Sequence, residues 1–66
     1  MNEQNRSSAA GLMTLEEAVE YLKISRASVY SLMKNGELAY VQIGGRRRFR
    51  ASDLTAFIEE RLVSAR

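Results

Sequence analysis

Two helix signatures follow one another in residues 14–36, which read TLEEAVEYLKISRASVYSLMKNG. The first opens with a capping box, because the Thr14 oxygen can accept an orphan backbone N–H while Glu17 reaches back to the cap. Apolar residues then recur at helical spacing and form one stripe at Leu15, Ala18, Val19 and Leu22. We expect this first helix to bury that stripe.

A second helix is expected after a connection of about three residues, which is helix-turn-helix spacing. Ser25 is a good N-cap, and Gly36 suits the left-handed position that ends a helix. The inner face of this helix is expected to comprise Val29, Leu32 and Met33.

A hairpin and a third helix follow. Residues 38–43 alternate imperfectly between apolar and polar, Gly44-Gly45 predicts a tight turn, and residues 46–50 return as a strand. The last helix is expected to start near Ser52 or Asp53, with an inner face of Leu54, Phe57, Ile58 and Leu62. The order helix, helix, hairpin, helix predicts a mainly α fold with a small β-hairpin, a winged helix-turn-helix.

Length and composition exclude several classes of protein. The chain has 66 residues, so we expect one domain over residues 12–66 and a disordered polar arm over residues 1–11. It has no cysteine and no histidine, which argues against disulfides, a structural zinc site, catalysis and any cofactor. No apolar run is long enough to span a membrane and no signal peptide is visible, so we expect a cytoplasmic protein.

Positive charge is concentrated in the middle of the chain. Residues 23–50 contain seven lysines and arginines against one glutamate, whereas both flanking segments are net acidic. A localised basic segment is typical of a protein that binds a polyanion.

The outward face of the second helix is the first candidate for DNA contact. Its residues are small, hydrogen-bonding or cationic, which suits a helix lying in a major groove about 12 Å wide. With the cap, they are Ser25, Arg26, Ala27, Ser28, Tyr30, Ser31 and Lys34. An ordinary polar helix face would look the same, and Tyr30 would equally serve as a packing residue.

The hairpin is the second candidate. Its candidate contact residues are Gly45, Arg46, Arg47, Arg48 and Arg50. Alternation places Phe49 inward and Arg48 and Arg50 outward together, and we expect Arg46 and Arg47 to splay near the turn. Clustered guanidiniums repel one another and favour an anionic partner such as phosphate. The alternative is a solvated strand edge that resists aggregation.

Several segments together resemble one known family. MTLEEA at residues 13–18, ISRASVY at 24–30, KNGEL at 34–38, IGGRRRF at 43–49 and DL at 53–54 are similar to the excisionase-type, MerR-like helix-turn-helix family. The resemblance covers about residues 12 to 63. It implies a winged-helix fold with residues 25–34 in the major groove of double-stranded DNA and the hairpin on the backbone or minor groove.

The resemblance also implies a function. Family members are excisionases, which help an integrase excise a mobile element, or small transcription regulators. Several copies bind adjacent sites cooperatively and bend DNA. The implied partners are DNA, a recombinase or the transcription machinery, in a bacterial or phage, nucleoid-associated setting. A protein-interaction module that docks through the acidic first helix is the third hypothesis.

The chain departs from the family pattern at Lys23, where glycine is common, and at Ser31, where a large basic residue is common. We see no heptad helix after the hairpin and so expect no dimerising coiled coil.

Overall fold

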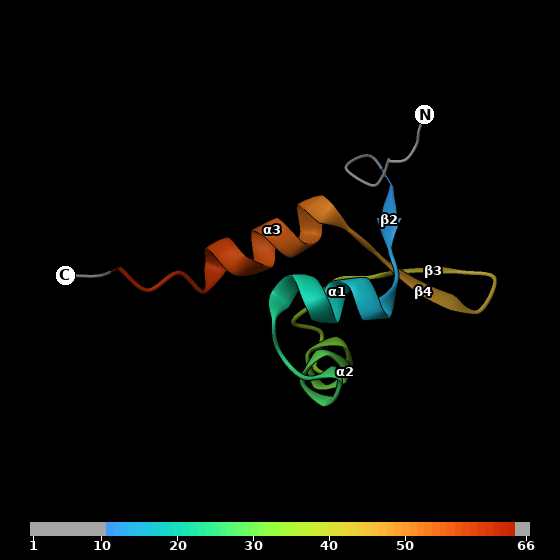
Figure 1. The fold of residues 1–66 in the computed structure, drawn as a ribbon, viewed down its shortest axis with the longest axis horizontal. Helices are drawn as coiled ribbons and strands as arrows, with labels where there is room; N and C mark the ends of the chain where they lie inside the picture. Colours follow the sequence, from blue (N-terminus) through green and yellow to red (C-terminus); the bar gives the residue numbers. More distant parts are fainter. Residues whose placement is uncertain (1–10, 65–66) are drawn as a thin grey trace.

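Three helices lie together beside a small antiparallel sheet in the computed structural model, which describes residues 11–64 (Figure 1). In chain order the elements are β2 (Leu12–Met13), α1 (Leu15–Leu22), α2 (Arg26–Lys34), β3 (Val41–Ile43), β4 (Arg46–Arg50) and α3 (Ala51–Glu60). Except for Gly11, the arm expected over residues 1–11 lies outside the described residues.

Helix α1 begins and ends as its sequence predicts. The Glu17 N–H donates to Thr14 Oγ1 at 3.1 Å and the Thr14 N–H donates to Glu17 Oε1 at 2.8 Å, so both halves of the capping box form. The helix ends at Lys23, whose φ of 59° and ψ of 36° are left-handed. A side chain raises the free energy of this conformation, which glycine would adopt with less strain.

Helix α2 is also closed at both ends. The Ser25 side chain accepts a backbone hydrogen bond at the N-terminus. At the other end Gly36 has a φ of 73°. Its N–H donates to the Met33 carbonyl at 3.1 Å, and the Glu37 N–H donates to the Leu32 carbonyl at 2.8 Å. This pair of bonds is a Schellman motif, which turns the chain sharply toward the hairpin.

The sheet has one strand more than the sequence predicts. Its order is β2-β4-β3, and the added strand β2 pairs Leu12 with Arg50 and Met13 with Phe49. A two-residue strand is too short to show a period-2 pattern, so nothing in the local sequence announces it. By pairing with β4 it covers an edge that a two-stranded hairpin would leave open and stabilises a marginal unit. The first hairpin strand is shorter than expected, because it begins at Val41 rather than at Leu38.

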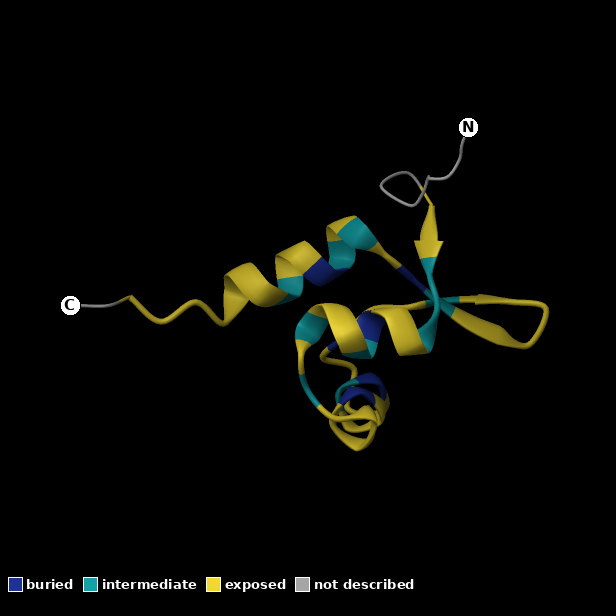
Figure 2. Ribbon diagram, in the orientation of Figure 1, coloured by how far each residue is buried: buried dark blue, intermediate teal, exposed yellow. Residues whose placement is uncertain are grey.

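The core lies where the helices meet the sheet, and Figure 2 shows its buried positions spread over both. Phe49 of β4 is fully buried and belongs to the same core cluster as the buried residues of the helices. The buried apolar residues are Ala18, Val29, Met33, Leu38, Phe49 and Leu54.

Helix α3 packs mainly against β4. It buries Leu54 and half-buries Phe57, but Ile58 is 45% and Leu62 is 79% exposed. The expected inner face is therefore wrong for these last two residues. The reason is visible in Figure 1: the C-terminal half of α3 runs outward from the sheet, and Leu62 lies beyond the helix end.

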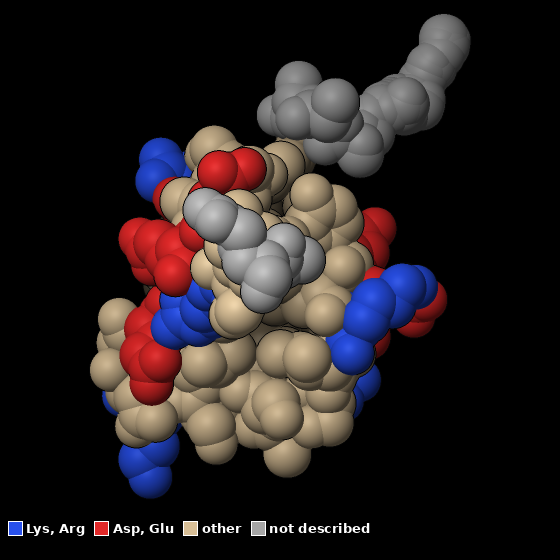
Figure 3. Space-filling model, turned by 90° about the vertical axis from the view of Figure 1, so that its left-hand side faces the viewer, with Lys and Arg blue, Asp and Glu red and all other residues tan. Residues whose placement is uncertain are grey.

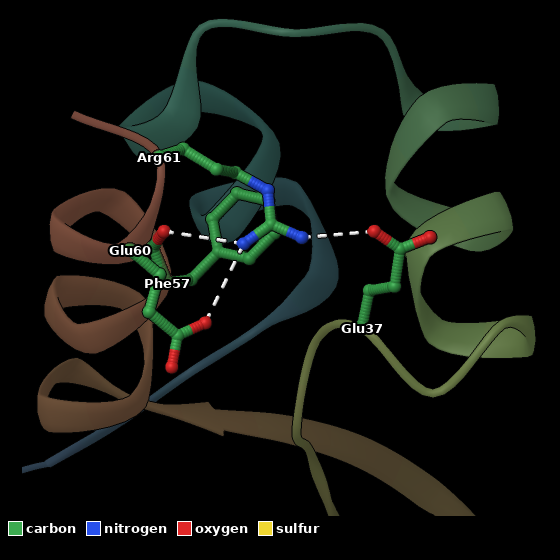
Figure 4. A network of polar contacts seen from close by, with 4 residues as sticks. All are labelled: Glu37, Phe57, Glu60 and Arg61. Carbon is green, nitrogen blue, oxygen red and sulfur yellow. Dashed lines mark hydrogen bonds and ion pairs between the residues drawn. The ribbon is translucent and has the colours of Figure 1, made fainter. Parts of the chain in front are cut away.

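A polar contact holds the end of α3 against the segment that follows α2 (Figure 4). Arg61 Nη2 lies 2.8 Å from Glu37 Oε1, and its Nη1 lies 3.6 Å from Glu60 Oε1. The same guanidinium lies over the Phe57 ring, 3.8 Å from its centroid. Stacking and charge pairing together fix the side chain more firmly than an exposed ion pair alone.

Candidate nucleic-acid interface

The outward face of α2 is as the sequence predicts. Val29 and Met33 are buried and Leu32 is half-buried. The predicted contact residues are all exposed: Ser25, Arg26, Ala27, Ser28, Tyr30, Ser31 and Lys34. A polar helix face at the edge of the molecule is accessible to a groove-shaped partner (Figure 1).

This face has two flanks with different neighbours. Tyr30 and Lys34 lie on the flank next to the hairpin, where they line a hollow together with Arg47. Ser28 and Ser31 lie on the other flank, in a shallow depression. The flank near the hairpin is therefore cationic and aromatic, whereas the far flank offers hydroxyl groups.

The hairpin extends from the body of the protein as a thin ribbon (Figure 1). Gly44 and Gly45 both have positive φ values, 55° and 79°. Two consecutive positive values are those of a type I′ turn, whose twist matches that of the flanking strands. Val41 faces Arg48 and Ile43 faces Arg46 across the ladder, so the turn presents arginines near its tip.

The arginines of β4 occupy both faces of the ribbon. Arg46, Arg48 and Arg50 share one face, and Arg47 lies on the face of buried Phe49. The guanidinium of Arg47 lies 5.9 Å from the Tyr30 ring centroid and 5.8 Å from that of Tyr40. The expectation that Arg47 splays near the turn is therefore wrong, because strand alternation directs it back toward α2.

Two of the predicted arginines are held by carboxylates. Arg50 makes two hydrogen bonds to Asp53, at 2.7 and 2.8 Å, and Arg26 lies 3.0 Å from Glu16. The Arg50 hydrogen bond lowers the pKa of Asp53, and the same pair raises the pKa of Arg50. A backbone hydrogen bond and then the Arg26 guanidinium lower the pKa of Glu16, while Glu16 raises the pKa of Arg26. The net charge that these arginines offer to a partner is reduced.

The other cations of the interface have no carboxylate within 4 Å among residues 11–64. They are Lys34, Arg46, Arg47 and Arg48. The face on the opposite side from the hairpin differs, since Figure 3 shows acidic and basic side chains interspersed around an uncharged centre. Among the interface residues that the structure describes, the positive charge without an ion pair thus lies on the hairpin and the neighbouring flank of α2.

The part of the chain that the structure describes contains no cluster of three or more potential metal-ligating side chains. Within that same part, no helix has the length and apolar character needed to cross a membrane.

Sequence reasoning missed three residues of this surface. Tyr40, which precedes strand β3, has its ring 5.8 Å from the Arg47 guanidinium. Glu16 of α1 forms an ion pair with Arg26 of α2, across the turn between the two helices. Neither contact has a local sequence signal. Asp53 had one, because an acid three residues after Arg50 at a helix start is a recognisable ion-pair spacing.

Comparisons with known proteins agree with the helix-turn-helix fold. Residues 12–62 match the model of a family described as a helix-turn-helix domain. The chain is 35% identical over 54 residues to a protein named excisionase from Streptomyces ambofaciens, a match that covers 82% of this chain and 87% of that protein. It is 41% identical over 49 residues to uncharacterized proteins of Mycobacterium bovis and Mycobacterium tuberculosis, a match covering 74% of this chain. The chain spans only 43% of the length of those mycobacterial relatives. No solved structure matches the chain.

Proposed function

Because the chain belongs to the helix-turn-helix domain family, a DNA-binding family, we propose that α2 enters the major groove of duplex DNA and the hairpin acts as a wing beside it. The wing would contact the adjacent backbone or minor groove. Residues 12–66 would form the DNA-binding domain, with residues 1–11 as an arm.

The charge distribution supports this docking. The four cations without a described carboxylate partner lie on the hairpin and on the adjacent flank of α2. Contacts to phosphate fix the position and register of a protein on the duplex, and contacts to base edges read sequence. We assign the first role to the hairpin arginines and the second to the hydroxyl-bearing flank of α2, including Ser28 and Ser31.

We further propose that the protein is an excisionase, a recombination directionality factor of a mobile element. The observation that carries this is the match to the Streptomyces ambofaciens excisionase, which extends over 87% of that protein. The similarity therefore concerns nearly a whole excisionase rather than one module of a larger protein.

With only four interface cations unpaired among residues 11–64, the domain would bind DNA weakly by itself. Copies on adjacent sites would raise the effective concentration of each neighbour and would bend the DNA cooperatively. Such a bent assembly would recruit or orient an integrase, which carries out the strand exchange.

A small transcription regulator is the second candidate. The mycobacterial relatives, of which the chain spans only 43%, contain a similar segment within a longer protein, an arrangement that would suit a regulator. The contacts to DNA would be the same, and the partner would be the transcription machinery.

The test starts with selection of the binding site from random duplexes. Affinity is then measured on duplexes carrying one or two copies of that site, and bending is measured from the mobility of circularly permuted fragments. We expect tighter binding per site on the tandem duplex and restored excision when the protein is added to the integrase. Equal affinity per site, no bending and no effect on excision would refute the excisionase proposal, and repression of a reporter would then favour the regulator.

A further inference from the structure

A hollow of about 340 Å³ lies between α2 and the hairpin. Its lining comes from Tyr30, Met33, Lys34, Tyr40 and Arg47. This volume is at the small end of the roughly 300–1,000 Å³ of ligand sites, so it suits a compact group rather than a large cofactor.

Two cations face this hollow from different elements. Lys34 belongs to the last turn of α2 and Arg47 to β4, and no carboxylate of residues 11–64 lies within 4 Å of either. Like charges that line one hollow repel each other, and an anion bound between them would relieve that repulsion. Met33, which is only 8% exposed, gives the hollow an apolar wall, and charge-assisted hydrogen bonds are stronger beside apolar surface.

The aromatic rings hold the arginine in place. Arg47 lies within 6 Å of both the Tyr30 and the Tyr40 ring centroids, close enough for cation–π attraction to each. Tyr40 is itself supported by Phe49, with ring centroids 6.4 Å apart. These contacts restrain the guanidinium before any ligand arrives, which would lower the conformational entropy lost on binding.

We propose that this hollow is a phosphate-binding notch, in which Lys34 and Arg47 together clamp one backbone phosphate of duplex DNA. The inference rests on the proposed DNA binding and adds to it a shared site at the junction of helix and wing. Tyr40 is then a positioning residue, because it acts through Arg47. A phosphate held at this junction fixes the angle between α2 in its groove and the hairpin beside it.

The test uses a random-sequence duplex, because a phosphate contact does not depend on sequence. The full chain is titrated by fluorescence anisotropy at several salt concentrations, as wild type, Lys34→Gln, Arg47→Gln and the double variant. Each neutralised phosphate contributes a log–log salt slope of about −0.9. If the two cations share one phosphate, the double variant flattens the slope by about 0.9 in total. Each single variant should lose about 10-fold in affinity, and the double variant should lose less than the product of these two losses.

Matched variants separate charge from packing. Lys23→Gln removes one positive charge from the ion-paired C-cap of α1, outside the notch, and should weaken binding less than Lys34→Gln. Tyr40→Phe keeps the ring that faces Arg47 and should bind as wild type, whereas Tyr40→Leu should weaken binding. Circular dichroism melts identify any variant that acts through unfolding, and binding is then compared below its melting range.

Two results would overturn the notch while leaving DNA binding intact. One is additive losses with a slope change of about 1.8 in the double variant, which means two separate phosphates. The other is an Arg47→Gln variant that melts earlier but binds DNA normally, which would make Arg47 a link between wing and helix only. A wild-type chain that binds no duplex even at low salt would instead refute the proposed function.

Discussion

Arg48 and Arg50 lie two residues apart on one face of β4, yet only Arg50 is paired with a described carboxylate. The substitutions Arg48→Gln and Arg50→Gln therefore compare a half-buried arginine that lacks a carboxylate partner among residues 11–64 with an exposed arginine that has one. Arg46 and Arg48 are assigned one phosphate each and the notch a third, so the wild-type salt slope should be about −2.7. Counting cations from the sequence alone, with about four to six contacts, predicts a steeper slope near −4 to −5.

Removal of Arg48 should flatten the slope to about −1.8, on cognate and random duplexes alike. Between 50 and 200 mM salt the wild type would then lose about 40-fold in affinity and the variant about 12-fold. Arg50→Gln should change the slope much less, because Asp53 already accepts both hydrogen bonds of that guanidinium. Anisotropy titrations at five salt concentrations measure all three slopes. If the salt slope of Arg50→Gln were as flat as that of Arg48→Gln, Arg50 would have exchanged Asp53 for a DNA phosphate. That result would refute the assignment of phosphate contacts to individual arginines.

The remaining predictions concern stability and acid sensitivity. Phe49→Ala removes a fully buried ring from a small core and should lower the free energy of unfolding by about 3–5 kcal/mol, which urea unfolding would register as loss of most of the folded state. A decrease below about 1 kcal/mol would contradict the assigned core. Lys23→Gly should be more stable than Lys23→Ala by about 0.5–1 kcal/mol, because glycine avoids the left-handed strain, although it loses more backbone entropy on folding. We expect the two melting temperatures to lie roughly 2–8 °C apart. The reverse order of stability would argue against a left-handed Lys23. Arg50 lowers the pKa of Asp53 below its ordinary value of 3.8, so the stability from this pair is present above that pH and is lost as pH falls through the lowered pKa. Melting curves of wild type and Asp53→Asn should therefore differ at pH 6 and converge in acid, and a constant difference down to pH 2 would contradict the linkage.

The elements that the sequence predicted well are those with local signals. The capping box at Thr14, the cap at Ser25 and the turn at Gly44-Gly45 each depend on residues within four positions of one another. Their side chains satisfy backbone groups that the same short segment leaves open, so the structure follows from neighbours alone.

The features that the sequence did not predict depend on distant parts of the chain. Strand β2 forms because Leu12 and Met13 pair with the end of β4. Tyr40 contacts Arg47 because the hairpin brings β4 back alongside the segment that contains Tyr40. The apolar spacing in α3 predicted burial of Ile58, but spacing says only which residues share a face, and the other elements do not extend far enough to cover the helix end.

The two halves of the proposed interface, α2 and the hairpin, have different chemistry, and this difference affects how the protein would combine affinity with specificity for DNA. Arg26 is the cation at the start of α2, and it is ion-paired with Glu16 of α1, so the helix would enter the proposed groove with little charge unpaired among the described residues apart from Lys34. The hairpin supplies Arg46, Arg47 and Arg48, whose attraction to phosphate is the same on any sequence. Affinity from the hairpin and discrimination from α2 would therefore be separable, and the three proposed phosphate contacts would give only weak binding to one site. A protein built this way would gain specificity chiefly when several copies occupy correctly spaced sites, as the proposed role at the ends of an excisable element requires and as an isolated half-site would not provide.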